Sequence, residues 1–182
     1  LGEVLADGLG DLDEAVVCYE AVLARAPSSK EALTHLERLQ FEREDWSRLY
    51  DVYARMVDAT TDELELAELY ARMARLAADA LSEEERAVDL WSRVIDLRGE
   101  DAESLATVAD LHERRGQWRD LAAVLERQLA IIGDGEDQVA ARIAIYKRLG
   151  RLGFDRLGVT ESALESWYRA HELDPQDRET LA

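Results

Sequence analysis

The stretch RAVDLWSRVIDL (residues 86–97) returns 76 residues later as SALESWYRAHEL (residues 162–173). When the comparison starts further upstream, at residues 69–97, it gives eleven identities in 29 positions and places Trp91 on Trp167. Self-similarity at a fixed offset is the sequence signature of stacked structural repeats. We therefore expect a repeat architecture in which equivalent positions perform equivalent packing tasks.

A second alignment extends the repeat to the rest of the chain. Residues 29–57 match residues 101–129 at an offset of 72, with eight identities in 29 positions, and Trp46 falls on Trp118. All four tryptophans thus belong to two repeat-related pairs. Each long repeat contains two helix pairs, so the basic unit is about 34 residues. This regularity favours packing roles for the tryptophans over roles as aromatic ligand platforms.

The local pattern of the sequence is helical. Apolar residues recur at three- and four-residue spacing, and glycine and proline are sparse. Three helix starts, at residues 28–31, 60–63 and 82–85, have the spacing of a capping box, with Ser28, Thr60 and Ser82 as caps. The pattern predicts helices at 1–8, 11–26, 29–43, 46–58, 62–80, 83–97, 101–115, 117–132, 136–156, 160–173 and from 176 to the end.

The predicted second helices carry the residues of a known family. A small residue is followed four positions later by a large aromatic one, and a proline closes the unit at Pro27 and Pro175. The chain in this way resembles the tetratricopeptide repeat family, although Leu49 and Leu121 stand where that family prefers alanine. The small and aromatic pairs are Ala15 and Tyr19, Ala87 and Trp91, and Ala163 and Trp167, and the first helices match through Met73-Ala74 and Leu149-Gly150.

The resemblance implies an all-α fold, a right-handed α–α superhelix of antiparallel helix pairs, with a double-unit super-repeat of 72–76 residues. One array is then expected to cover residues 1–182. Its units are expected at about 1–29, 30–63, 64–101, 102–135 and 136–177, with a partial unit at 178–182.

Charge and composition exclude several classes of function. The formal net charge is −18, from 40 acidic and 22 basic residues, so the protein repels phosphate backbones and we expect no nucleic-acid partner. No apolar run is long enough to cross a bilayer, which predicts no membrane insertion. The three histidines, the single Cys18 and the GDGED stretch (133–137) form no metal-binding or nucleophile motif. We therefore expect no cofactor, no metal and no enzymatic activity.

The resemblance implies that a protein or peptide partner binds in a concave groove formed by the first helices. Guanidinium and aromatic side chains in such a groove suit an acidic or C-terminal peptide. The alternative is that the arginines form solvated ion pairs with acids four positions away, such as Glu42, Asp79 and Asp155. The candidate partner-binding residues are Arg38, Phe41, Arg75, Lys147, Arg151 and Phe154, together with Asp79, Asp110, Arg114 and Asp155.

The partner itself is not defined by the sequence, and two other functions stay open. The chain could be a spacer segment of a longer repeat array, or a regulatory module of an enzyme in the same polypeptide. Self-association through the ends of the array is a further interaction that the sequence leaves open. Lysine is rare beside arginine, a bias typical of a GC-rich bacterial gene, and a cytoplasmic location is favoured.

Overall fold

The computed structural model describes residues 12–176, and all regular structure within this range is helical. These residues belong to two compact units, divided between Arg98 and Gly99. None of the described helices is both long enough and apolar enough to span a membrane.

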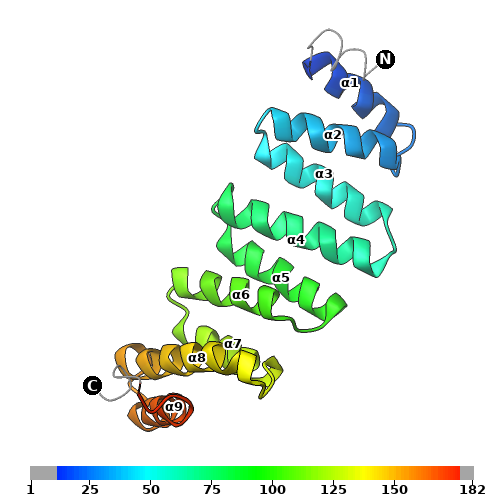
Figure 1. The fold of residues 1–182 in the computed structure, drawn as a ribbon. Coiled ribbons are helices and arrows are strands. Elements are labelled where there is room, and N and C mark those ends of the chain that lie inside the picture. The colour runs from blue at the N-terminus through cyan, green and yellow to red at the C-terminus, as the bar shows by residue number, and fades with distance from the viewer. Residues whose placement is uncertain (1–11, 177–182) are drawn as a thin grey trace. The chain divides into compact units, whose positions relative to one another are not determined.

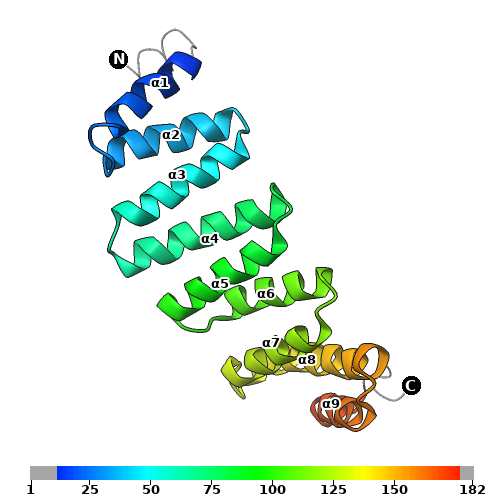
Figure 2. The same cartoon turned by 180° about the vertical axis from the view of Figure 1, so that it is seen from behind.

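The first unit is a series of helices in which each packs on its neighbours in chain order (Figures 1 and 2). Its buried side chains are mostly alanine, valine and leucine, and Leu33, Leu36 and Leu39 are fully shielded from solvent. The apolar faces of neighbouring helices thus form a continuous core. The helices are α1 (Leu12–Leu23), α2 (Lys30–Glu42), α3 (Trp46–Ala59), α4 (Glu63–Asp79) and α5 (Glu84–Arg98).

The second unit follows the same scheme with one irregular helix. Its core contains Leu105, Leu111, Leu121 and Leu125, all at most 1% exposed. Helix α8 packs against both α7 and α9, and a π-helical turn at its C-terminal end contacts α7 and α9 as well. The elements are α6 (Ala102–Arg114), α7 (Trp118–Ile131), the 3₁₀ turn η2 (Glu136–Gln138), α8 (Val139–Leu152), the π turn η3 (Gly153–Leu157) and α9 (Thr160–Leu173).

The predicted helices are confirmed within residues 12–176, and most ends lie within three residues of their expected positions. The exception is the single helix expected at 136–156, which is divided into η2, α8 and η3. A period of 3.6 residues does not reveal a 3₁₀ or π turn at a helix end. The expected helices at 1–8 and from 177 onward lie outside the described residues, and the division into five units and a partial sixth stays a prediction.

The predicted helix caps are wrong in position. The capping side chains are Ser29 and Asp62, each of which accepts a hydrogen bond from the backbone N–H three residues later. The expected caps Ser28 and Thr60 precede them by one and two residues. Ser82 does not cap α5, which begins at Glu84, because its backbone has a φ of 56°. Aspartate and serine are equally good caps, so a run of such residues leaves the helix start ambiguous.

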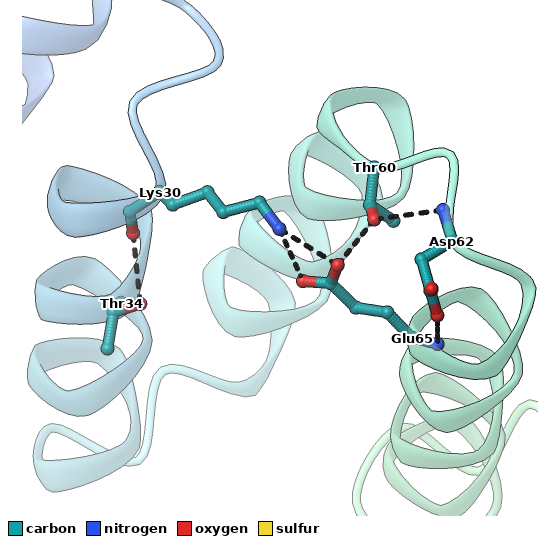
Figure 3. A network of polar contacts seen from close by, with 5 residues as sticks. All are labelled: Lys30, Thr34, Thr60, Asp62 and Glu65. Carbon is teal, nitrogen blue, oxygen red and sulfur yellow. Dashed lines mark hydrogen bonds and ion pairs between the residues drawn. The ribbon is translucent and has the colours of Figure 1, made fainter.

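A polar network fixes the start of α4 to the start of α2 (Figure 3). Lys30 Nζ donates to both carboxylate oxygens of Glu65, at 3.0 and 2.8 Å, and the Thr60 hydroxyl donates to the same carboxylate at 2.5 Å. These hydrogen bonds lower the pKa of Glu65, and the one from Lys30 has the larger effect. The cap on Asp62 and this contact therefore define where α4 begins and which helix it faces.

Lys30 and Glu65 belong to a set of ion pairs whose members are 35 residues apart in sequence. This separation is close to one repeat, so each pair joins helices at equivalent positions of successive units: α1 to α3, α2 to α4, or α6 to α8. Exposed ion pairs contribute at most about 1 kcal/mol each, but repeated pairs of this kind fix the register between neighbouring repeats. The pairs are Glu20–Arg55, Lys30–Glu65, Glu37–Arg72 and Glu113–Arg148.

The buried Tyr53 should make the stability of the protein depend on pH. Burial of Tyr53, reinforced by the neighbouring Glu37 carboxylate, raises the pKa of its phenol from 10.0 to about 12. The folded state thus holds this proton more tightly than the unfolded state. We expect the free energy of unfolding to fall as the pH rises from 10 to 12, by at most about 1.4 kcal/mol per pH unit for one such group. Urea denaturation at each pH measures the slope.

The matched variant for this measurement is Tyr53→Phe, which keeps the aromatic ring and removes the titrating group. The rest of the sequence is identical in the two proteins, so the difference between the two slopes isolates Tyr53. Parallel loss of stability in the wild type and the variant between pH 10 and 12 would contradict the prediction.

Candidate functional site: a cationic pocket in the second unit

The second unit contains a pocket of about 470 Å³ between the start of α7 and the C-terminal half of α8. Its volume lies within the range of ordinary ligand sites, about 300–1,000 Å³. The pocket is lined by Glu113, Trp118, Leu121, Ala144, Lys147, Arg148, Arg151, Leu152, Asp155 and Arg156.

The charge of the pocket opposes that of the whole chain. Four lining residues are cations, namely Lys147, Arg148, Arg151 and Arg156, and two are carboxylates, Glu113 and Asp155. Four minus two gives a formal charge of +2, within a protein whose net charge is −18. A positive pocket on an acidic protein provides a local site for an anion and leaves most of the surface repulsive to other anions.

Two of the arginines are held in place by neighbours. Arg148 forms ion pairs with two carboxylates of α6: it lies 3.2 Å from Asp110 and also contacts Glu113. The Arg156 guanidinium carbon lies 4.9 Å from the ring centroid of Trp118, in a cation–π contact. Both guanidinium groups are thereby oriented before any ligand arrives, which reduces the entropy lost on binding.

The turn between α6 and α7 positions Trp118. Gly116 has a φ of +66°, and a β-carbon on it would lie 3.5 Å from the Trp118 ring. The Gln117 backbone N–H donates to the His112 carbonyl at 2.9 Å, and the side chains of the same two residues are joined at 2.8 Å. A left-handed residue with this bonding pattern ends α6 sharply. Trp118 therefore packs against this turn, and it also forms one wall of the pocket.

The remaining lining residues lie on one stripe of α8 that continues into η3. Residues Ala144, Arg148, Leu152 and Arg156 are spaced by four, as are Lys147, Arg151 and Asp155. In a regular α-helix a four-residue step overshoots one turn by about 40°. The wider π turn at Gly153–Leu157 rotates less per residue and offsets this drift. It thereby keeps Asp155 and Arg156 on the pocket side of the helix.

The predicted partner-binding residues fall into two groups, one in each unit. In the second unit, Lys147 and Arg151 line the pocket, whereas Phe154 is 56% exposed and lies 5.9 Å from Trp167 between ring centroids. The two cations thus lie at one pocket, and Phe154 contacts a different tryptophan from the one that lines it; the partner-binding role of all three residues stays a prediction.

In the first unit the candidate residues Arg38, Phe41 and Arg75 lie on α2 and α4. Arg38 forms an ion pair with Glu42, four residues later, at 3.9 Å. Such a pair is what we expect if the arginine is a solvated surface residue and not a partner contact. Phe41 is 62% exposed and packs edge-on to Trp46 at 5.8 Å. The Arg75 guanidinium lies over the ring of Trp91, at 5.5 Å.

Sequence reasoning missed Arg148, Arg156 and Trp118 as members of a site. A pairing rule limited to i,i+4 neighbours does not find the partners of Arg148, because Glu113 precedes it by 35 residues. The repeat length itself is the missing signal: an acid and a base one unit apart, on equivalent helices, are expected to meet. No comparable signal predicts Arg156, whose position depends on the π turn.

The fold defines the class of this protein: each of its two units consists of packed antiparallel helices, with ion pairs between equivalent helices one repeat apart, as in an α–α solenoid. The tetratricopeptide repeat family model matches residues 104–139, which contain α7 and most of α6. The resemblance to that family and the predicted all-α, tetratricopeptide-repeat-like fold are both confirmed.

The similarity to solved structures of the same fold covers nearly the whole chain. MamA has a TM-score of 0.55 at 19% identity and covers 96% of this chain and 95% of its own. YrrB, described as a TPR protein with an unusual peptide-binding site, has a TM-score of 0.54 at 15% identity, over 97% of this chain and 85% of its own. A kinesin light chain-like repeat protein from Podosopora anserina has a TM-score of 0.54 at 18% identity, over 92% and 89%. A search of curated proteins finds no match.

Proposed function

We propose that this chain is a non-enzymatic protein-interaction scaffold, and that the pocket of its second unit binds an acidic segment of a partner protein. The observation that carries this proposal is the pocket's charge of +2 in a chain of −18. A tetratricopeptide-repeat-like fold suits a role in protein–protein contact, and YrrB supplies an example of a protein of this fold with a peptide-binding site. In the first unit, Arg38, Phe41 and Arg75 remain proposed contacts for the same class of partner.

The acidic character of the ligand follows from the pocket's donors. Lys147 and Arg151 contribute positive charge from one face of α8, and the oriented Arg148 adds a guanidinium fork that matches a carboxylate. Trp118 provides an apolar surface for the partner's side chain or backbone. The long-range repulsion from the rest of the protein opposes any highly charged polyanion and favours a short acidic segment presented locally.

Selection of a random peptide library on the immobilised protein tests this proposal. Enriched peptides should carry net negative charge, and their affinity should fall at least tenfold in the Lys147→Gln/Arg151→Gln variant, as measured by fluorescence anisotropy. Affinity should also fall as sodium chloride rises, because exposed charges are screened.

The matched control is Arg127→Gln/Arg169→Gln, which removes two charges from exposed ion pairs of the same unit, Arg127–Glu100 and Arg169–Glu172. It should retain the wild-type affinity. Enriched peptides without acidic residues would refute the proposal, as would equal binding by the pocket variant with an unchanged helical spectrum.

A further inference from the structure

We infer that the pocket is built to receive a phosphorylated side chain of a partner peptide, and that it selects this dianion over a carboxylate. This inference rests on the proposed function and specifies the ligand of the same site. Its basis is the number, charge and prior orientation of the cationic groups that line the pocket.

The first argument is charge balance. The lining residues carry a formal charge of +2, and Asp110, which pairs with Arg148 from outside the lining, reduces the local charge to +1. A phosphomonoester carries between −1.5 and −2 charges at pH 7, whereas a glutamate carries −1. Within the same group of four cations, a phosphate therefore gains more electrostatic attraction than a carboxylate does.

The second argument is the hydrogen-bonding capacity of the arginines. Arg148 uses part of its guanidinium to bind Asp110 and Glu113, and a guanidinium has five N–H donors. The Arg156 guanidinium carbon lies over the Trp118 ring, and a cation–π contact of this kind does not use up the N–H donors of a guanidinium. With Lys147 and Arg151 on the same stripe, the donors converge from two turns of α8 and from η3. The three acceptor oxygens of a phosphate can use such a set, in the manner of phosphate-binding arginine clusters.

The third argument is size. The pocket encloses about 470 Å³, while a phosphate group occupies the space of only a few water molecules at about 30 Å³ each. The remaining volume accommodates the atoms that attach the phosphate to a peptide and part of the flanking chain. The half-buried Trp118 offers apolar surface for those atoms. The geometry thus suits a phosphate carried on a peptide better than a free ion.

Four probes test the inference by chemical-shift mapping of the ¹⁵N-labelled protein. They are the blocked tripeptides Gly-phosphoserine-Gly, Gly-Glu-Gly and Gly-Ser-Gly, and inorganic phosphate. We expect the phosphoserine peptide to shift the Trp118 indole and the amides of α8 and η3, and to bind at least ten times more tightly than the glutamate peptide. Inorganic phosphate should bind more weakly than the phosphoserine peptide, and the unmodified serine peptide should not bind.

The pH dependence gives a second readout. No histidine lines the pocket; the groups that face the ligand are Lys147, three arginines, Glu113 and Asp155, and none of these types ordinarily titrates near pH 6. The second ionisation of the phosphate has a pKa of about 6. Affinity for the phosphoserine peptide should therefore fall severalfold from pH 7.5 to pH 5.5, while that for the glutamate peptide should stay nearly constant.

The outcomes separate this inference from the proposed function. Loss of phosphoserine binding in Lys147→Gln/Arg151→Gln, with retention in Arg127→Gln/Arg169→Gln, supports the inference. Equal affinity for the glutamate and phosphoserine peptides overturns the selectivity but leaves the proposed acidic-peptide function standing. Equal affinity for inorganic phosphate and the phosphoserine peptide overturns the peptide as the source of the phosphate. If the phosphoserine peptide does not bind at all, the inference is wrong. The library selection still tests the proposed function independently in that case.

Discussion

Replacement of Trp91 by alanine should lower the free energy of unfolding by about 3–5 kcal/mol, the usual cost of truncating a buried tryptophan. The side chain of Trp91 is 3% exposed and lies beneath the Arg75 guanidinium, so truncation removes both a large apolar volume and a cation–π contact. Stabilities of whole domains are only 5–15 kcal/mol. A loss of this size should therefore unfold a substantial fraction of the protein near physiological temperature. Urea denaturation followed by far-UV circular dichroism measures the change.

Two further variants make the Trp91 result specific. Trp46→Ala removes the same side chain from the half-buried start of α3 and should cost clearly less. Trp91→Phe should cost only about 1–2 kcal/mol, since it keeps an aromatic ring. It also removes an indole N–H that has no acceptor among residues 12–176. If Trp91→Ala were no more destabilising than Trp46→Ala, the packing role assigned to Trp91 would be wrong.

The fold was predictable because equivalent positions of successive repeats carry residues that pack in the same way. Tyr19, Tyr53, Trp91, Leu125 and Trp167 occupy equivalent positions of successive second helices; the first four are at most 9% exposed, whereas Trp167 is half-buried. Self-alignment therefore identifies the core before any contact is known. Helix bounds followed from periodicity, and they failed where the backbone leaves the 3.6-residue repeat, at η2 and η3.

The pocket was only partly predictable, because its parts come from different levels of structure. Lys147 and Arg151 were expected on a first helix, and they lie there. Arg148 owes its orientation to partners on α6, 35 and 38 residues earlier. Trp118, the first residue of α7, was expected only to pack within the fold. A site assembled from a π turn and inter-repeat ion pairs cannot be derived from a pattern confined to one helix.

Gly150, the small member of the pair Leu149-Gly150, lies where α8 and α9 approach too closely for a side chain. Gly150 is buried on α8, and a β-carbon on it would lie 2.4 Å from Nε1 of Trp167 and 2.6 Å from its Cδ1. Its repeat equivalent in the first unit is Ala74, which has a β-carbon and is fully buried. The two helices of the second unit are therefore packed more closely at this point than a side chain allows.

Substitution of Gly150 by valine should consequently cost about 3 kcal/mol, because the Trp167 ring must leave its position in a packed interface. The gain in helix propensity over glycine, a few tenths of a kcal/mol, offsets little of this. Gly133→Val is the control: a β-carbon there meets no atom within 4 Å, and the change should stay within about 0.5 kcal/mol.

A double variant tests whether the Trp167 ring causes the loss. In the presence of Trp167→Leu, which frees the space of the indole, Gly150→Val should cost at least about 1 kcal/mol less than in the wild type. Urea denaturation of the four proteins of this cycle gives the coupling directly. Additive effects of the two substitutions would show that Gly150 is required for a reason other than the close approach of Trp167. Coupling of the expected sign would identify this contact as the constraint that excludes a side chain at position 150 of α8.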